Sequence, residues 1–547
     1  MLDIYLLWIT FLFLDFTFAF GSNSEFTSNS VEKYVAYDQN DPVYRGVSIG
    51  GWLVTEPYIT PTLYKNATEI AKNKQSTINI IDEYTLCQAL GHDDARILLD
   101  SHFKTWITES DFKQISEEGF NIVRIPIGYW AWKLDYETNM YPGNYTYDDP
   151  YVNRIQLDYL NNAYQWAAKY NLKVMLDLHG VPGSQNGFDN SGQTLEKPLW
   201  LTKENSTEIT TAILREQIDS IFNSNSSSSV SALEIVNEPL GPKLNMTEIV
   251  NFYEDTLEYY TITKNKVSTP ASNVTFIIHD AFQSPGYWDE YLNPNYINTT
   301  SSYLEGKNYT YSPRSIVVDH HHYEVFTDSQ LVESQYIRLK HINDFAISIS
   351  EELSSHSAFV GEWSGAITDC ATWLNGIGVG SRYDGTFSSN SSSSTFGRST
   401  TNNRTCTSQN PVSEWSNEYK IQVRQFIEAQ LAYYSTHTNG WIFWNWKTEG
   451  AAEWDYKELK KNGLFPHPFN KYKYFDKEGN IKPSVSSSLY SEYTSSLSST
   501  ASGASSTGAY KNGTSNLIKN KNKNILQSLC GWSLMLLCIT VGATALF

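Results

Sequence analysis

Eight short apolar segments recur along the chain, and each is separated from the next by enough residues for a helix. They have the length and the β-branched content of strands that are buried on both faces. Between them lie amphipathic stretches such as residues 418–433, where apolar positions recur at helical spacing. The pattern predicts strands at residues 45–55, 121–128, 173–180, 233–239, 274–281, 315–323, 358–364 and 440–447.

Strands that alternate with helices build a parallel sheet, and eight such units close into a (β/α)₈ barrel, the TIM barrel. We therefore predict an α/β fold with a single barrel domain over residues 40–485. In such a barrel, the residues at the C-terminal ends of the strands gather at one face and line a common pocket.

Two of the predicted strands end in a glutamate. The run at residues 233–239 (LEIVNEP) stops at Pro239, which has no N–H for the ladder, and leaves Glu238 at the strand tip. The run at residues 358–364 (AFVGEWS) brings Glu362 to a similar place. The sequence between the two glutamates fits three βα units of roughly 30 to 40 residues each, which places them on strands four and seven.

Paired carboxylates across a pocket are what the cleavage of a glycosidic bond requires. One protonates the leaving oxygen, and the other attacks or stabilises the anomeric carbon. Glu238 suits the acid, because partial burial is expected to raise its pKa and the neighbouring Asn237 can hold both the side chain and a substrate hydroxyl. The alternative for Glu362 is an exposed strand end without a catalytic role.

Three further strand residues point to the same pocket. Arg124 lies inside an apolar strand, where a cation is costly unless it is paired, so we expect it to face a carboxylate. His179 stands at the tip of the third strand, where a side chain lines the pocket. Trp444 in the eighth strand could form a floor on which a sugar ring stacks.

The sixth strand ends in the sequence DHHHY, whose three consecutive histidines invite a metal site. Side chains alternate along a strand, so His321 and Tyr323 share one face while His320 and His322 point to the other. We therefore predict no three-histidine cluster, no metal and no cofactor.

The composition narrows the class of substrate. The chain has 547 residues, of which 14% are aromatic, and its 16 Trp and 37 Tyr exceed what packing usually needs. Aromatic faces that stack on sugar rings explain the excess. The formal net charge of −19 argues against nucleic acid and anionic membrane surfaces as partners, and it suits a neutral substrate.

The N-terminal segment is typical of a secretory signal. An apolar run precedes Thr17 and Ala19, which are small residues at −3 and −1 of a cleavage site. We predict a signal peptide at residues 1–19 and a polar leader at residues 20–39. Asp3 stands where a basic residue is usual, so an N-terminal anchor is the alternative.

The C-terminal segment changes composition abruptly. A Ser-rich stalk at residues 486–512 is followed by a Lys/Asn spacer and an apolar tail at residues 529–547. Small residues, a polar spacer and an apolar tail form the pattern of a GPI-attachment signal. We predict attachment at Asn512 and removal of residues 513–547, and a retained membrane-spanning helix is the alternative.

Eleven glycosylation sequons and the cysteines fit an exported protein. Cys370 and Cys406 bracket a Ser/Asn/Gly-rich insertion and could form a disulfide in an oxidising compartment, which leaves Cys87 as a buried thiol. The sequons are at Asn66, Asn144, Asn205, Asn225, Asn245, Asn273, Asn298, Asn308, Asn390, Asn403 and Asn512.

Seven segments of the predicted barrel carry a resemblance to a known family. They are residues 50–60 (GGWLVTEPYIT), 121–128 (NIVRIPIG), 179–192 (HGVPGSQNGFDNSG), 235–242 (IVNEPLGP), 321–326 (HHYEVF), 361–364 (GEWS) and 441–449 (WIFWNWKTE). In these segments, the chain resembles the yeast and fungal exo-β-1,3-glucanases of glycoside hydrolase family 5, in the branch with a C-terminal GPI signal. The run at residues 179–192 is the most specific of them.

The resemblance implies Glu238 as the acid/base and Glu362 as the nucleophile. It also implies a sugar-binding shell, and an aromatic pair, Phe188 and Phe326, that grips the next sugar at the pocket entrance. The resemblance further implies that the protein acts on β-1,3-glucan and that it is a monomer. It also implies a location at the outer face of the plasma membrane and in the cell wall. The residues implied for the shell are Glu56, Tyr58, Arg124, His179, Asp189, Asn190, Asn237, His321, Tyr323 and Trp444.

One loop departs from the family pattern. Val379 stands where a basic residue is expected, and the Ser-rich stretch at residues 388–394 is longer than usual. The contacts on the acceptor side, and with them the preferred chain length, therefore stay open.

The spacing of the two carboxyl groups would decide the mechanism. If they stand ~5 Å apart, no water fits between sugar and base, so Glu362 attacks directly with retention of configuration while Glu238 keeps a raised pKa. Three other functions stay open: a transglycosylase with the same residues, an endo-β-1,4-glucanase, and a glucan-binding protein, which would lack one of the glutamates.

Overall fold

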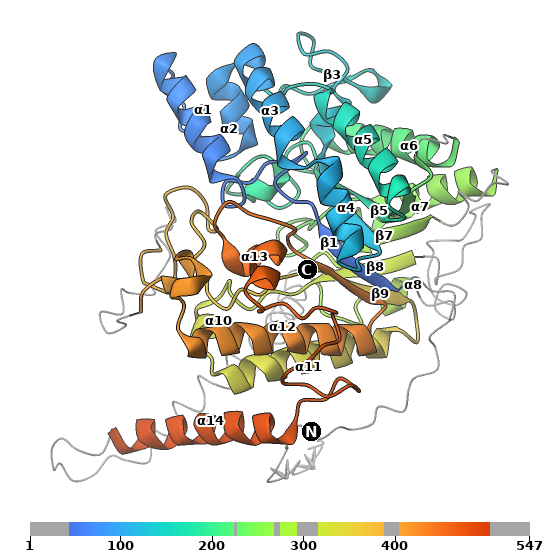
Figure 1. Cartoon of the computed structure of the whole chain (residues 1–547). Helices are drawn as coiled ribbons and strands as arrows, with labels where there is room; N and C mark the ends of the chain where they lie inside the picture. The colour runs from blue at the N-terminus through green and yellow to red at the C-terminus, as the bar shows by residue number, and fades with distance from the viewer. Residues whose placement is uncertain (1–42, 224–226, 267–273, 293–315, 388–403, 504–547) are drawn as a thin grey trace, which may run out of the picture. The chain divides into compact units, whose positions relative to one another are not determined.

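A closed barrel of eight parallel strands lies at the middle of the fold (Figure 1), which confirms the predicted (β/α)₈ architecture. The computed structural model describes residues 43–223, 227–266, 274–292, 316–387 and 404–503. The strands follow one another around the barrel in chain order, and the last pairs with the first. They are β1 (Tyr44–Ser48), β2 (Ile122–Gly128), β5 (Lys173–Gly180), β6 (Val230–Glu234), β7 (Thr275–His279), β8 (Ile316–His321), β9 (Ser357–Trp363) and β10 (Gly440–Phe443).

Several strands end earlier than the sequence predicted. β1 stops at Ser48, because the chain turns at Gly51, whose φ of 66° lies in the left-handed region. β6 stops at Glu234, well before Glu238, and Trp444 likewise follows its strand. Glu238 and Trp444 therefore belong to loops at the C-terminal face of the barrel, whereas His179 and Glu362 lie within β5 and β9.

The barrel interior is filled in layers of side chains. A cluster of buried side chains, the apolar layer, is almost wholly apolar and takes one side chain from each of the eight strands. Because side chains alternate along a strand, the residues two positions further on also face the interior. The members of this apolar layer are Tyr44, Ile122, Met175, Ala232, Ile277, Val317, Phe359 and Ile442.

Helices fill the connections, and α11 and α12 run side by side (Figure 1). Many start at a side-chain cap: in α12, Ser416 Oγ accepts a hydrogen bond from the N–H of Tyr419 (3.1 Å). Strands β3 (Met140–Tyr141) and β4 (Tyr145–Thr146) form a small hairpin. The helices of the barrel unit are α1 (Pro61–Asn73), α2 (Glu83–Leu90), α3 (His92–Trp106), α4 (Glu109–Glu117), α5 (Ile155–Lys169), α6 (Ser206–Asn223), α7 (Met246–Asn265), α8 (Asp289–Leu292), α10 (Asp328–Val332), α11 (Gln335–Glu352), α12 (Asn417–His437) and α13 (Tyr456–Lys461).

The C-terminal part divides from the barrel unit. The chain splits into Met1–Leu489 and Tyr490–Phe547, and helix α14 (Pro483–Gly503) spans the division. Much of the predicted Ser-rich stalk is therefore helical. Within the described residues, no helix has the length and apolar character needed to cross a membrane. The predicted signal peptide, leader, attachment site at Asn512 and propeptide lie outside those residues.

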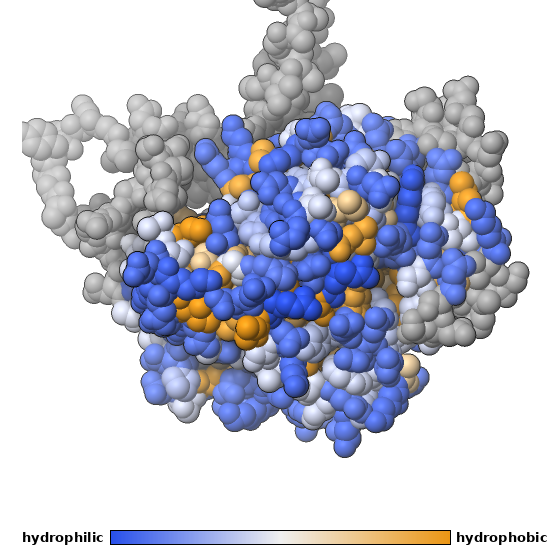
Figure 2. All heavy atoms as spheres, turned by 90° about the horizontal axis from the view of Figure 1, so that it is seen from above, coloured by the Kyte–Doolittle hydropathy of each residue, from blue (hydrophilic) through white to orange (hydrophobic). Residues whose placement is uncertain are grey.

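The surface is mostly hydrophilic on the face shown in Figure 2, with smaller hydrophobic areas between. Three predicted glycosylation sites, Asn66, Asn144 and Asn245, are exposed, and Asn205 is half-buried. The remaining sequons fall in segments that the structure does not describe. Glycosylation stays a prediction, and three of the four described sites are exposed enough to carry a glycan.

Candidate active site

The interior layer two residues beyond the apolar one is charged. Arg124, which follows Ile122 in this way, is fully buried. Its Nε donates to Glu234 (2.8 Å) and its Nη1 to Glu362 (2.6 Å), while its Nη2 lies 3.1 Å from Asp177. The prediction that this arginine faces a carboxylate is confirmed. Because a buried cation is stable only when it is paired, the arginine and the three carboxylates hold one another in place.

A β-bulge aims Glu362 into this layer. The register of β8 with β9 shifts just before His321, which pairs with Glu362, so β9 carries one extra residue, Gly361. Strict alternation from Phe359 would otherwise point the glutamate out of the barrel. Gly361 has to be glycine, since a Cβ there would lie 2.0 Å from a carboxylate oxygen of Asp319.

Glu238 reaches the same place from the loop after β6. Its φ of 46° is a left-handed conformation, which is rare for a residue with a side chain and costs free energy. Its Oε1 lies 2.8 Å from Nδ1 of His321, and Asn190 donates to its Oε2 (3.0 Å). The same nitrogen of His321 lies 3.5 Å from Oε2 of Glu362. The two glutamates therefore meet at one imidazole.

His321 controls the protonation of Glu238. Burial raises the pKa of Glu238, but the hydrogen bond and the positive charge of His321, with the hydrogen bond from Asn190, outweigh it and lower that pKa. Burial lowers the pKa of His321, but the charges of Glu362 and Asp319 overcome this and raise it well above its usual value. The expectation of a raised pKa for Glu238 is therefore wrong, because it rested on burial alone and left out the positive charge of His321.

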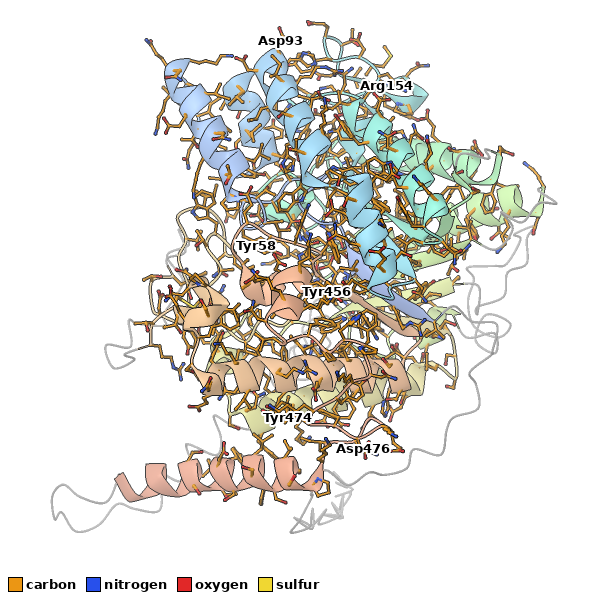
Figure 3. All side chains as sticks on the ribbon, viewed as in Figure 1. Tyr58, Asp93, Arg154, Tyr456, Tyr474 and Asp476 are labelled. Atoms are coloured by element: carbon orange, nitrogen blue, oxygen red, sulfur yellow. A yellow bond between two sulfur atoms is a disulfide. The ribbon has the colours of Figure 1, made fainter. Side chains whose placement is uncertain are left out.

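Trp444, His179 and Tyr58 come together at the same pocket. The rings of Trp444 and His179 stack with an angle of 7° and centroids 5.7 Å apart. Trp444 Nε1 donates to the hydroxyl of Tyr58 (2.5 Å), which lies on the segment between β1 and α1 (Figure 3). His179 Nδ1 contacts Asp177 (2.6 Å), which fixes the orientation of the ring. The loop residue that we predicted as a floor thus packs flat against the predicted pocket histidine.

Two more buried carboxyl groups belong to the predicted shell. Burial raises the pKa of Glu56 well above its usual value, and the charge of Asp189 raises it further. Burial and the charge of Asp82 raise the pKa of Asp189 itself to about 7. A carboxyl group in such a place can accept a hydrogen bond when ionised and donate one when protonated.

Besides Nε2 of His321, which lies 3.7 Å from a carboxylate oxygen of Asp319, four polar atoms of the predicted shell are buried with no hydrogen-bond partner among the described residues. Leaving such atoms unpaired costs free energy, so a ligand that pairs with them gains affinity and specificity. Donors and acceptors in a small space suit the hydroxyl groups of a sugar. The atoms are Glu56 Oε1, His179 Nε2, Asp189 Oδ2 and Asn237 Nδ2.

Tyr323 and the two phenylalanines lie toward the solvent. The hydroxyl of Tyr323 donates to Oε2 of Glu362 (2.8 Å). The ring of Phe326 packs against Tyr323 and Trp454, with centroids 5.7 and 6.4 Å away. Phe188 and Phe326 are each 42% exposed, so neither ring belongs to the core. This exposure fits the entrance positions that the resemblance implied.

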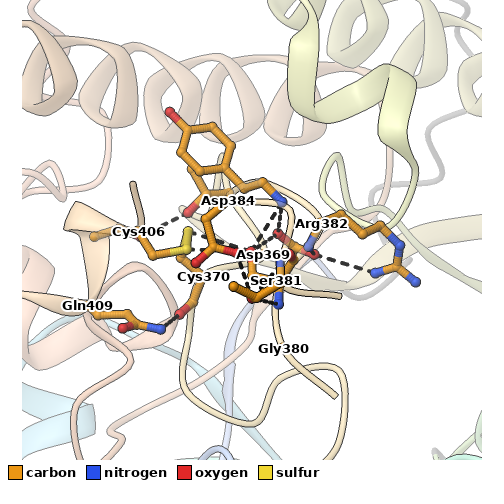
Figure 4. Close-up of a disulfide and its surroundings, with 12 residues drawn as sticks. Asp369, Cys370, Gly380, Ser381, Arg382, Asp384, Cys406 and Gln409 are labelled. Carbon is orange, nitrogen blue, oxygen red and sulfur yellow. Dashed lines mark hydrogen bonds and ion pairs between the residues drawn. A yellow bond between two sulfur atoms is a disulfide. The ribbon is translucent and has the colours of Figure 1, made fainter. Parts of the chain in front are cut away.

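The loop after β9 is held by a disulfide and by a buried aspartate (Figure 4). Cys370 and Cys406 form the predicted disulfide, with Cα atoms 5.2 Å apart. Beside it, Asp369 accepts hydrogen bonds from Ser381 Oγ (2.6 Å) and from the N–H of Arg382 (2.8 Å). These contacts hold Ser381 and Arg382 beside the disulfide in the part of the loop that the structure describes. Cys87 is a buried free thiol, as predicted.

The three consecutive histidines do not converge. His320 contacts Asp280 (2.8 Å) and His322 contacts the hydroxyl of Tyr434 (2.7 Å), whereas His321 faces the glutamates. The predicted alternation is confirmed.

Three groups of histidines and carboxylates in the described residues bring one ligand atom each within 4.8 Å. Two of them lie at the site above, where Arg124 supplies the balancing charge. In the third, hydrogen bonds with two carboxylates raise the pKa of His341 to about 10, so a proton balances the charge there. The absence of a metal from the mechanism stays a prediction. The groups are Glu238, His279 and His321; Glu234, Asp319 and His321; and Glu324, Glu333 and His341.

Four further members of the charged layer, Asp177, Glu234, His279 and Asp319, were not predicted from the sequence. Each lies two residues after a member of the apolar layer. The cost of burying a charge, which singled out Arg124, applies equally to the three carboxylates and could have identified them. His279 gives no such signal, because a neutral histidine is common in a core.

Relatives of the chain are found among curated proteins, although no family model matches it. "Glucan 1,3-beta-glucosidase 2" of Saccharomyces cerevisiae is 51% identical over 530 residues, which cover 93% of this chain and 92% of the relative. The chain belongs to the glucan 1,3-beta-glucosidase family. Another member, "Glucan 1,3-beta-glucosidase 2" of Candida albicans, is 42% identical over 82% of this chain and 89% of its own length. The glucan 1,3-beta-glucosidase of Lachancea kluyveri is 39% identical over 85% and 98%.

Solved structures repeat the barrel. The rutinosidase from Aspergillus niger superposes with a TM-score of 0.50 at 21% identity, covering 78% of this chain and 98% of its own. The structure of AoRut gives a TM-score of 0.52 at 18% identity, with 77% and 96% covered. At these identities the likeness shows the fold alone, which is the barrel that the sequence predicted.

Proposed function

We propose that the chain is a retaining exo-β-1,3-glucanase that releases glucose from the non-reducing ends of cell-wall β-1,3-glucan. The observation that carries the proposal is the meeting of Glu238 and Glu362 at Nδ1 of His321. The two carboxylate oxygens concerned are no further apart than these two distances combined, about 6.3 Å. Retaining enzymes hold their carboxyl groups close together, roughly 5–5.5 Å apart, and a shared imidazole is a contact that supports such an arrangement.

Glu362 is the nucleophile in this proposal. Arg124 and the hydroxyl of Tyr323 each hold one of its oxygens, so the carboxylate is fixed in orientation. It attacks the anomeric carbon and forms a covalent glucosyl-enzyme, while the bond to the leaving oxygen breaks.

Glu238 is the acid/base. It lies in a pair with His321 that carries a proton, since the pKa of the histidine is raised and that of the glutamate lowered. Glu238 passes a proton to the departing oxygen and later takes one from the water that hydrolyses the glucosyl-enzyme. Formation of the ester with Glu362 removes a negative charge beside this pair, which prepares it for the second step.

The shell residues give the site its preference for a terminal sugar. Glu56, Asp189, His179 and Asn237 offer buried polar atoms to the hydroxyl groups of one glucose. Phe188 and Phe326 then hold the next sugar of the chain, because a flat apolar ring stacks on the C–H face of a pyranose.

An exported, anchored enzyme completes the proposal. The apolar N-terminal run and the C-terminal small-residue, spacer and tail pattern support secretion and a GPI anchor at the plasma membrane and the cell wall. Truncation before Lys519 should release active enzyme into the medium. A full-length protein that resists phosphatidylinositol-specific lipase and still carries Phe547 would instead have a retained helix.

Digestion of laminari-oligosaccharides tests the activity. We expect β-glucose as the first product, one residue at a time, with product size and anomer followed by NMR. α-Glucose as the first product, or release of internal fragments, contradicts the proposal. Products longer than the substrate, formed at high substrate concentration, would identify a transglycosylase that uses the same residues.

A further inference from the structure

His279 stands beside the catalytic pair without a place in the mechanism above. It is the last residue of β7 and fully buried, two positions after Ile277 of the apolar layer. Its partner in the strand register is Asp319, whose side chain contacts Gly361 in the charged layer. His279 therefore faces the barrel interior at the level of the ions.

The ring of His279 packs against His321. The two ring centroids are 4.4 Å apart, and the planes meet at 81°. A ring nitrogen of each histidine and a carboxylate oxygen of Glu238 lie within 4.8 Å of one another. Because rings in such edge-to-face contact restrict each other's rotation, His279 limits the directions in which His321 can point.

The backbone fixes the ring of His279 itself. The N–H of Ala281 donates to its Nδ1 (3.0 Å), so that nitrogen is an acceptor and the ring proton is on Nε2. This bond requires an unusual turn, in which Ala281 and Phe282 have φ angles of 57° and 59°. Two consecutive left-handed residues with side chains are strained, and such strain persists at sites where a side chain has to be aimed.

The ring also stays uncharged. Burial lowers the pKa of His279 well below its usual value, and the positive charges of His321 and Arg124 lower it further. A second cation against His321 would repel it from Glu238. A neutral ring, in contrast, supports His321 without competing for the carboxylate.

We propose that His279 is a positioning residue for the acid/base carboxylate: its ring, fixed by the N–H of Ala281, holds His321 where Nδ1 meets Glu238. The inference rests on the proposed function, in which Glu238 supplies the proton to the leaving group. It predicts that the loss of His279 impairs protonation of the leaving group rather than binding of glucose.

Two substrates with different leaving groups distinguish a loss of leaving-group protonation from other effects of the substitution. A disaccharide such as laminaribiose has a poor leaving group and needs the acid, whereas dinitrophenolate leaves without protonation. In His279→Asn, the amide oxygen replaces Nδ1 as the acceptor for Ala281 while the ring is lost. We expect kcat/KM for laminaribiose to fall at least about tenfold, and kcat/KM for dinitrophenyl β-glucoside to fall much less.

A matched control comes from the start of β9. His356 is also a buried histidine, and its Nδ1 contacts the carbonyl oxygen of Ser357 (3.1 Å), at the opposite end of β9 from Glu362. His356→Asn should change both substrates equally. An equal loss on both substrates in His279→Asn, or no loss on either, overturns the proposal for His279.

Two results keep the outcome clear. If the variant fails to fold, ¹⁵N NMR of the histidine-labelled wild-type protein decides: a neutral His279 protonated on Nε2 is expected, and a proton on Nδ1 or a charged ring overturns the proposal. If the wild-type protein itself does not hydrolyse laminaribiose, the proposed function fails first. An active wild type with an unchanged substrate ratio in the variant removes only the role of His279.

Discussion

Two adjacent layers of the barrel interior are built from the same eight strands and have opposite chemistry. The layer with Ile122 and Ile277 is almost wholly apolar and stabilises the fold by burial. The layer two residues along holds Arg124 among three carboxylates, where each ion is tolerated only because the others are present. The comparison teaches that one layer stabilises the fold, while burial of the charges in the next layer costs free energy and holds them in a fixed geometry.

The largest effect should follow from removing Glu362, the proposed nucleophile. Glu362→Ala should lower turnover of every substrate by on the order of 10⁴-fold or more, since no other group can form the ester. Azide should partly restore turnover and give an α-glucosyl product, because it enters the space of the lost carboxylate. Retained activity near that of the wild type would remove Glu362 from the mechanism.

Breaking the charged layer should cost both stability and activity. Arg124→Met leaves Glu234 and Asp177 buried without their cation, which should lower the free energy of unfolding by about 3–5 kcal/mol. Ile122→Val, in the apolar layer of the same strand, should cost only about 1 kcal/mol and leave kcat unchanged. Chemical denaturation and laminaribiose kinetics check both, and equal behaviour of the two variants would refute the distinction between the layers.

A buried ion group outside the pocket sharpens the comparison, because it should affect stability alone. Burial raises the pKa of Glu324, but hydrogen bonds with His322 and His341 outweigh it and lower that pKa to about 2. A depressed pKa contributes stability above the unfolded value of about 4.5, and this contribution is lost as the pH falls toward 2. Glu324→Gln should therefore cost on the order of 2 kcal/mol at pH 6 and much less at pH 3.

The check is chemical denaturation at the two pH values. Glu351→Gln, which changes an exposed glutamate on α11, is the control and should have no effect at either pH. A cost for Glu324→Gln that is the same at pH 6 and pH 3 would mean that the ionised form makes no special contribution.

The smallest effect should come from the entrance, where exposed rings add affinity and little stability. Phe188→Ala or Phe326→Ala should lower kcat/KM on laminaribiose by about fivefold, or on the order of 1 kcal/mol, through loss of one stacking contact. A nitrophenyl glucoside should be affected far less, because its leaving group needs little positioning. A lowered melting temperature with equal loss on both substrates would place the ring in the core instead.

The sequence predicted most of the fold because the barrel depends on local patterns. Apolar runs identify all eight strands, and helical periodicity identifies helices between them. The cost of a buried charge identifies Arg124. Two features of the site were beyond such reasoning. The bulge at Gly361 depends on register with β8, and the left-handed backbone of Glu238 depends on the loop packed around it.

The protonation of the site was also beyond the sequence. Burial of Glu238 could be predicted from its place at a strand end, but its contact with His321 is a tertiary one between loops and strands far apart in the chain. That contact reverses the direction of the pKa shift. The helix that runs through the Ser-rich stretch to Gly503 was likewise not predicted, since serine is only an average helix former.

Trapping of the covalent intermediate tests the central claim most directly. A 2-deoxy-2-fluoro-β-glucosyl fluoride carries a good leaving group and forms an ester that is hydrolysed slowly. Incubation of the wild-type enzyme followed by peptide mass spectrometry should find one fluoroglucosyl group, on Glu362, together with loss of activity. A label on Glu238, or inactivation that never occurs in an enzyme whose first product is α-glucose, would contradict the double displacement.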